Sequence, residues 1–138
     1  MAETRRLSPP ADLLEVAKRA WTNTYAPYSG FKVGAALRAE SGAIYLGANI
    51  ENASYTVTRC AEQSAVQAMA SNGERRFLEI LVFAAADQPA SPCGACRQVM
   101  HEFAPEATVY LVNPQGAVKV YTVAELLPDG FGLERPAK

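Results

Sequence analysis

The sequence has little of three things that would narrow its class: charge of one sign, long apolar runs and histidine. Thirteen Lys and Arg face 14 Asp and Glu over 138 residues, so the formal net charge is -1. This balance gives no general attraction to nucleic acid or to an anionic membrane, and we expect neither as a partner. No stretch reaches the roughly 20 apolar residues needed to cross a bilayer.

An export signal is also lacking. Arg5 and Arg6 are followed by Pro9, Pro10 and Asp12 instead of an apolar core, so no secretory signal is visible. Free cysteines without such a signal are typical of the reducing cytoplasm, where we expect the protein to act. The length and a hydrophobic content of 49% predict one globular domain over residues 1–138.

Cysteine is scarce, and its placement carries the chemistry. Three cysteines cannot all pair within one chain, which disfavours a disulfide framework. Cys93 and Cys96 have the Cys-x-x-Cys spacing of zinc ligands, and Cys60 can supply a third thiolate. Three protein ligands leave a fourth position open to water, as in catalytic zinc sites. The alternative, three small buried apolar residues, does not account for this spacing. The only histidine, His101, lies about 140° around a helix from Cys96, so we expect it at the surface or an interface.

Glu62 follows Cys60 by two residues, beside the predicted open position. There it can move protons rather than bind metal. The plainer alternative is a carboxylate stabilised by the helix dipole in a first turn. A cysteine and glutamate pair followed by Pro-Cys-x-x-Cys is, however, the signature of zinc deaminases that act on nucleobases.

Helical and strand patterns alternate along the chain. We predict helices over residues 9–25, 60–71, 93–103 and 123–127, and strands over 33–39, 43–46, 79–86, 108–112 and 117–121. The apolar run at 80–83 indicates a central strand. The order of these elements predicts an α/β fold, a three-layer α/β/α sandwich with a mixed five-stranded sheet. From about residue 129 we expect a tail that is loosely structured or lies at a subunit interface. Both cysteine clusters start a helix, where the dipole favours thiolates.

Five ordered segments resemble the small cytidine deaminases across nearly the whole chain. They are APYSGFKVGAAL at 26–37, GANIENASY at 47–55, CAE at 60–62, SPCGACRQV at 91–99 and ELLPDGFG at 125–132. The resemblance implies the cytidine deaminase-like fold and one Zn²⁺ per subunit on Cys60, Cys93 and Cys96. It also implies hydrolytic deamination of cytidine and 2′-deoxycytidine to uridine and 2′-deoxyuridine, with release of ammonia, for pyrimidine salvage.

The resemblance further implies roles for five residues around the substrate. Glu62 would carry protons from the zinc-bound water to ring nitrogen N3 and then to the departing ammonia. Phe31 would stack on the pyrimidine, Asn49 and Glu51 would bind the ribose, and the N–H groups near Ala61 would hold the base carbonyl. The plainer alternatives are a core phenylalanine and loop-forming polar residues.

Two aromatic residues match family positions that reach into a neighbouring subunit's site, Tyr55 and Phe131. The resemblance therefore implies a homo-oligomer, usually a tetramer, with composite active sites.

One position departs from the family pattern. Three-cysteine members commonly have Arg after the catalytic Glu, where this chain has Gln63. Three thiolates on Zn²⁺ leave a net charge of -1, which an Arg would partly offset and a neutral amide offsets less. Arg59 and Arg97 are the candidates for compensation, and the N–H groups at the helix starts are the alternative.

Two other functions remain open. The scaffold could deaminate another aminopyrimidine, such as a nucleoside antibiotic resembling blasticidin S, although the ribose block at 49–52 argues against it. The chain could also be a non-catalytic zinc module. Glu62 beside an open metal position argues against that, because a structural site needs neither.

Overall fold

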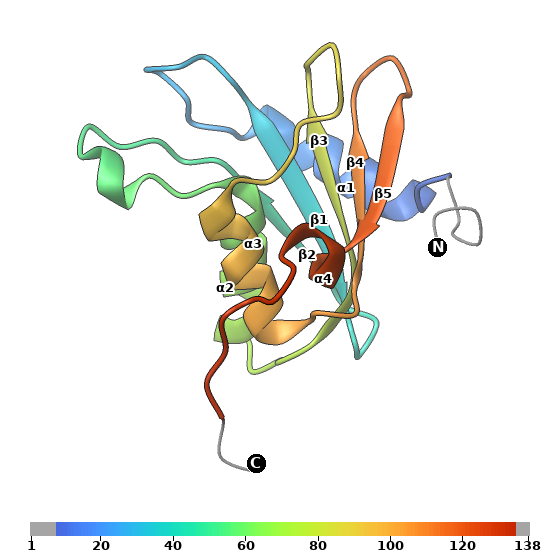
Figure 1. The fold of residues 1–138 in the computed structure, drawn as a ribbon. Coiled ribbons are helices and arrows are strands. Elements are labelled where there is room, and N and C mark those ends of the chain that lie inside the picture. Colours follow the sequence, from blue (N-terminus) through green and yellow to red (C-terminus); the bar gives the residue numbers. More distant parts are fainter. Residues whose placement is uncertain (1–7, 135–138) are drawn as a thin grey trace.

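The computed structural model describes residues 8–134 and contains one five-stranded sheet with strand order β2-β1-β3-β4-β5 (Figure 1). Its strands are β1 (Val33–Ala39), β2 (Ile44–Ala48), β3 (Phe77–Ala84), β4 (Thr108–Val112) and β5 (Val118–Thr122). The pairs are antiparallel except that of β3 with β4, which is parallel. The predicted mixed five-stranded sheet is therefore confirmed.

Helices cover both faces of the sheet. Helix α1 (Ala11–Thr22) packs on one face, where Leu13 contributes to a core with Ala36 and Leu81. Helices α2 (Ala61–Ser71), α3 (Gly94–Phe103) and α4 (Val123–Leu126) contribute to the core on the other face, which includes Leu37 and Ile80. Successive strand residues thus alternate between the two cores. Strand β3 is buried on both faces, which explains its nearly unbroken apolar run.

Several element ends differ from the sequence prediction. The first helix stops at Thr22 and not at Tyr25, because Tyr25 turns away to donate its N–H to Asn49 O. Strand β3 begins two residues earlier than predicted, at Phe77. Cys60 and Cys93 are N-cap residues, in extended conformation immediately before their helices. The loop over 49–59 contains a short 3-10 helix at Tyr55–Val57, and its green ribbon projects from the body in Figure 1.

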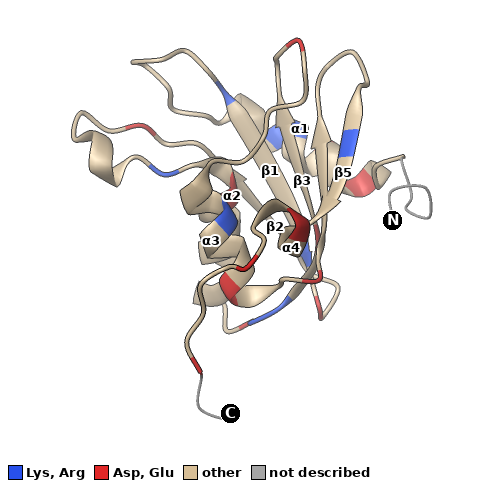
Figure 2. Cartoon of the chain, viewed as in Figure 1, with Lys and Arg blue, Asp and Glu red and all other residues tan. Residues whose placement is uncertain are grey.

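The described part of the tail, up to residue 134, has no helix or strand after α4. The amide of Gln98 on α3 donates to Phe131 O at 3.1 Å and ties the tail to the body. The rest of the predicted tail, 135–138, lies outside the described residues. Within 8–134, no helix has the length and hydropathy of a membrane span. Acidic and basic residues are interspersed in the view of Figure 2.

Helix α2 crosses β2 at backbone contact distance. A Cβ added to Gly47 would lie 2.4 Å from both Ala61 O and Ala65 N. Helix α1 makes the equivalent crossing of β1, where a Cβ on Gly34 would lie 2.2 Å from Ala17 O. Real Cβ atoms do not approach backbone this closely, so both glycines are required by packing.

Gly47→Ala should therefore lower the free energy of unfolding by about 3 kcal/mol or more, since backbone atoms cannot move aside without shifting α2. Urea denaturation of the variant against the unmodified protein measures this loss. Gly132→Ala is the matched control, because nothing lies within 4 Å of a Cβ at that position. Equal stability of the two variants would contradict the packing of α2 on β2.

Candidate metal centre and active site

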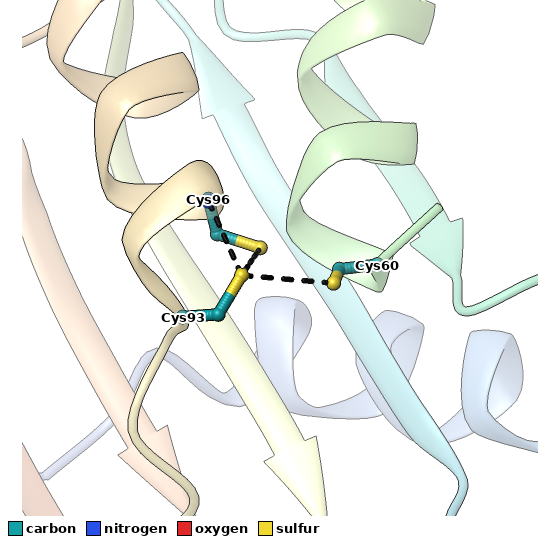
Figure 3. Close-up of side chains that lie close together, drawn as sticks. All are labelled: Cys60, Cys93 and Cys96. Atoms are coloured by element: carbon teal, nitrogen blue, oxygen red, sulfur yellow. Dashed lines mark hydrogen bonds between the residues drawn. The ribbon is translucent and has the colours of Figure 1, made fainter. Parts of the chain in front are cut away.

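The starts of α2 and α3 bring the three cysteines together (Figure 3). The Sγ atoms of Cys60 and Cys93 are 3.9 Å apart, those of Cys93 and Cys96 are 3.2 Å apart, and all three lie within 4.8 Å of one another. Tetrahedral zinc with bonds of about 2.3 Å sets its sulfur ligands about 3.8 Å apart. The spacing therefore suits one shared ion.

The protonation of these thiols also fits a metal. The pKa of Cys60 is lowered to about 6, chiefly by a hydrogen bond from Cys96, with Arg59 adding a smaller attraction. The pKa of Cys96 is raised, first by its hydrogen bond with Cys60 and then by burial. Cys60 thus loses its proton readily, whereas Cys96 holds its proton. A divalent cation overcomes that resistance, because metal binding displaces the remaining thiol protons.

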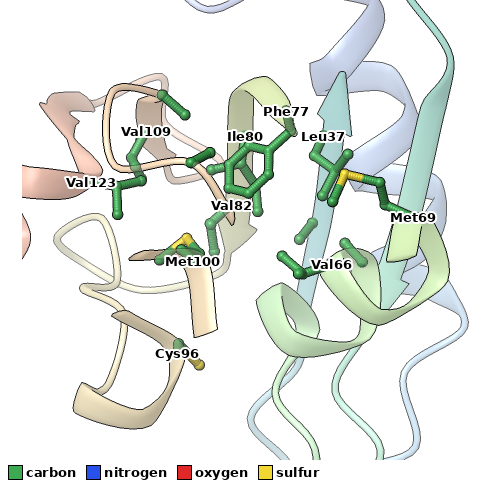
Figure 4. Packing of buried hydrophobic residues seen from close by; sticks show 14 of the residues in the cluster. Leu37, Val66, Met69, Phe77, Ile80, Val82, Cys96, Met100, Val109 and Val123 are labelled. Atoms are coloured by element: carbon green, nitrogen blue, oxygen red, sulfur yellow. The ribbon is translucent and has the colours of Figure 1, made fainter. Parts of the chain in front are cut away.

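The metal centre lies on the margin of the larger core. Cys96 is 1% exposed and belongs to the same apolar cluster as Met100 and Val66 (Figure 4). Cys93 is exposed by comparison and opens toward the cavity described below. The core therefore shields the metal centre from water on the side of Cys96, and the cavity leaves it open to a substrate on the side of Cys93.

The charge around the sulfurs is met by Gln63 and not by a directly bonded arginine. The side-chain amide of Gln63 is buried and donates to Cys96 Sγ at 3.5 Å. Arg97 was one of the two candidates for compensation, but its hydrogen bonds go to the oxygens of Pro92, Ser91 and Leu126. Arg59 bonds to backbone carbonyls and acts on Cys60 only through its field.

Gln63→Leu should weaken zinc binding about 10-fold to 100-fold, because it removes the donor that supports a ligand sulfur while keeping a similar volume. Competition with a chromophoric chelator measures the affinity. Gln67→Leu, one turn further along α2 at an exposed position, is the control and should bind zinc normally. Normal zinc affinity of the Gln63 variant would show that the helix N–H groups suffice.

Glu62 lies in the first turn of α2 and is 4% exposed. Burial is the main cause that raises the pKa of Glu62 to about 7, and the nearby Cys60 thiolate adds to the rise. A carboxyl with a pKa near neutrality can both accept and release a proton at physiological pH. The position and protonation of Glu62 therefore suit proton transfer.

One cavity of about 270 Å³ collects eight of the ten predicted site residues. These are Phe31, Asn49, Glu51, Cys60, Ala61, Glu62, Cys93 and Cys96. Tyr55 lines a neighbouring cavity of about 360 Å³, which shares a wall with the first at Ser29, Glu51 and Thr58. Phe131 lines neither cavity and is 66% exposed.

Three hydroxyl residues that had no predicted role also line the first cavity, Ser29, Thr58 and Ser91. Ser29 and Ser91 lie within the segments that resemble the cytidine deaminases, close to residues for which the resemblance implies a role. Thr58 had no signal beyond its place in a polar loop. The partners of these hydroxyls are visible only in the structure: Ser29 donates to Glu51, Thr58 accepts from the N–H of Asn52, and Ser91 accepts from Arg97.

The comparison with protein families shows to which family a chain with this site belongs. Residues 8–112, from before α1 to the end of β4, match the model of the cytidine and deoxycytidylate deaminase zinc-binding region. The chain belongs to this deaminase family. All three cysteines and Glu62 lie within the matched range, so the family match agrees with the zinc site that the geometry indicates.

Relatives in the deaminase family cover nearly the whole chain. A cytidine deaminase from Sporosarcina psychrophila is 49% identical over 123 residues, 88% of this chain and 90% of the relative. One from Halalkalibacterium halodurans is 50% identical over 123 residues, 88% and 93% of the two chains. The crystal structure of cytidine deaminase from Burkholderia pseudomallei has a TM-score of 0.86 and 46% identity, over 89% of this chain and 99% of that one. These matches confirm the predicted deaminase fold.

Proposed function

We propose that this protein is a zinc-dependent hydrolase that converts cytidine and 2′-deoxycytidine to uridine and 2′-deoxyuridine with release of ammonia, in pyrimidine salvage. The observation that carries the proposal is the single cavity in which three cysteine sulfurs meet a buried Glu62 and the polar side chains of Asn49 and Glu51. This set provides ligands for a metal, a proton carrier and groups for a sugar in one place.

Cys60, Cys93 and Cys96 would hold the ion. When bound, zinc would activate a water molecule and stabilise charge that develops at C4 of the base. Glu62 would accept a proton, deliver it to ring nitrogen N3, and later deliver one to the departing amino group. The N–H at Ala61 is available for the base carbonyl, because the first N–H groups of a helix have no partner within it.

The other cavity residues would position a nucleoside. Phe31 is 44% exposed at the cavity, which leaves an aromatic face for the pyrimidine ring. Asn49 and Glu51 would bind the sugar hydroxyls. A carboxylate accepts hydrogen bonds from hydroxyls and repels phosphate, so the site favours nucleosides over nucleotides and over a nucleic acid chain.

The decisive assay follows the fall in ultraviolet absorbance when the purified protein meets cytidine, with and without a chelator. Fast loss that the chelator abolishes, with ammonia released in equal amount, would support the proposal. A protein that binds zinc but leaves cytidine unchanged would instead support a non-catalytic zinc module. Turnover of an aminopyrimidine antibiotic without turnover of cytidine would support a deaminase that acts on such an antibiotic.

We also propose that the chain works as one domain in a cytoplasmic homotetramer, in which Tyr55 and Phe131 complete a neighbouring site. Tyr55 is 77% exposed, Phe131 is 66% exposed and Leu133 is 76% exposed. Phe131 and Leu133 share one segment, and large apolar side chains at such exposure are typical of a surface that another subunit covers.

Phe131→Ala should accordingly raise the Michaelis constant for cytidine, and dilution to monomers should abolish activity even with zinc bound. Sedimentation at matched concentrations gives the assembly state beside each rate. Leu78→Ala is the control, since Leu78 is 48% exposed at the start of β3, away from the cavity. A fully active monomer would contradict the composite site.

A further inference from the structure

Three donors from the segment just before β1 hold the carboxylate of Glu51. Its Oε1 accepts from the N–H groups of Tyr28 at 3.0 Å and Ser29 at 3.2 Å, and its Oε2 accepts from the Ser29 hydroxyl. These bonds hold the pKa of Glu51 below its usual value, with the Ser29 hydroxyl as the largest cause. The orientation of Glu51 therefore depends on the neighbouring loop.

The same hydroxyl also fixes Phe31. The N–H of Phe31 donates to Ser29 Oγ at 3.0 Å. At the other end of the residue, Phe31 O accepts from Asn49 Nδ2 at 2.9 Å, while Asn49 Oδ1 accepts from the N–H of Val33 at 2.8 Å. The backbone of Phe31 is thus held by Ser29 on one side and by Asn49 on the other.

A serine hydroxyl has one proton to donate and lone pairs to accept. Because Ser29 gives its proton to Glu51, its lone pair is left for the Phe31 N–H, and the two bonds support each other. Ser29 also lies on the wall shared by the two cavities. One hydroxyl therefore links the backbone of Phe31 to the carboxylate of Glu51 where the two cavities meet.

We infer that Ser29 is a positioning residue that couples the two halves of the nucleoside site, by fixing the backbone that carries the Phe31 ring for the base and the Glu51 carboxylate for the sugar. The inference rests on the proposed function, in which those two side chains contact the two parts of the substrate. Ser29 itself need not touch the reacting atoms. Loss of its hydroxyl frees Glu51 Oε2 to rotate and leaves the Phe31 N–H to water.

The test compares Ser29→Ala with the unmodified protein on cytidine and on 3′-deoxycytidine. We expect kcat/KM for cytidine to fall about 10-fold, mainly through KM, because a hydrogen bond to a charged group is lost. The fall on 3′-deoxycytidine should be clearly smaller, since the sugar hydroxyl that Glu51 would hold is absent. An equal fall on both substrates would overturn the coupling to Glu51.

Ser29→Thr keeps the hydroxyl and should recover most of the lost activity, and a loss equal to that of Ser29→Ala would overturn the inference. Unfolding midpoint and zinc content are measured for every variant. We expect both to match the unmodified protein, because Ser29 is exposed. Loss of zinc or of the fold in Ser29→Ala would show a purely structural role and would also overturn it.

The chain contains a matched control for this hydroxyl. Ser41, after the other end of β1, donates to Glu74 Oε2 at 2.9 Å and accepts from the N–H of Ala43 at 3.3 Å. Ser41→Ala should show normal kinetics, and a loss as large as that of Ser29→Ala would count against a specific role. If the unmodified protein fails on cytidine, the proposed function falls; if it succeeds and Ser29→Ala is unaffected, only this inference falls.

Discussion

Glu62→Gln is expected to lower the turnover of cytidine by about 1000-fold while the protein keeps its fold and its zinc. General acid and base groups contribute about 100-fold to 10,000-fold, and Glu62 is proposed to move a proton more than once per turnover. Glutamine has nearly the same shape, so it can occupy the same buried place in the first turn of α2, but its neutral amide does not titrate and cannot carry a proton. Initial rates and zinc content of the purified variant test this.

Glu74→Gln is the matched control for that experiment, because Glu74 follows the far end of α2 and bonds to Ser41 and Tyr45. Its turnover should stay normal. A Glu62→Gln variant that kept a tenth of the activity would show that another group moves the protons.

The same substitution should change how the metal-depleted protein responds to pH. The pKa of Glu62 rises from 4.5 to about 7 on folding, so the folded chain binds more protons than the unfolded chain between these values. Stability contributed by this group is therefore present below about pH 4.5 and is lost as the pH rises to about 7. Denaturation at several pH values should show that decline in the parent and a weaker one in Glu62→Gln.

Removal of zinc is expected to abolish activity and to lower the unfolding temperature. An ion held by ligands at the starts of two helices binds only the folded arrangement with full affinity, so its loss removes that share of stability. Thermal unfolding before and after treatment with a strong chelator measures the change. Zinc should restore both properties, and magnesium should restore neither, because thiolates are soft ligands that Mg²⁺ does not prefer.

Two results would contradict this account of the metal. Full activity after complete removal of zinc would exclude a catalytic ion. Loss of activity with an unchanged unfolding temperature would mean that the ion does not hold α2 and α3 together. Cys60→Ser should resemble the chelated protein, since a hydroxyl is a poor substitute for a thiolate ligand.

Much of the fold was predictable from local pattern. The apolar run in β3 indicated a strand buried on both faces, and the structure places β3 between β1 and β4. The positions of Cys60 and Cys93 at helix starts followed from composition and from Pro92. The end of the first helix was predicted wrongly, because Tyr25 is drawn into a bridge with Ile50, a partner 25 residues away.

The contacts that organise the site were not predictable for the same reason. Gln63 could be expected to face the sulfurs, but which thiol it meets depends on how α2 and α3 dock. Arg97 looked equally suited to that task, yet it spans from Pro92 to Leu126 and ties the start of α3 to the end of α4. Such hydrogen bonds join segments that are far apart in sequence, and the hydrophobic periodicity of each segment does not predict them.

The separation between helix starts and loops has a consequence for how this scaffold can change. The sulfurs and Glu62 lie at the starts of α2 and α3, and contact with the sheet sets the place of α2, as at Gly47. Phe31 and Glu51 stand on connecting segments outside the helices and strands. Exchange of those segments between homologues should alter which sugar is accepted while the ion and its reactivity are retained. The helix starts would thus keep the reaction constant among homologues, while the connecting segments would change the substrate.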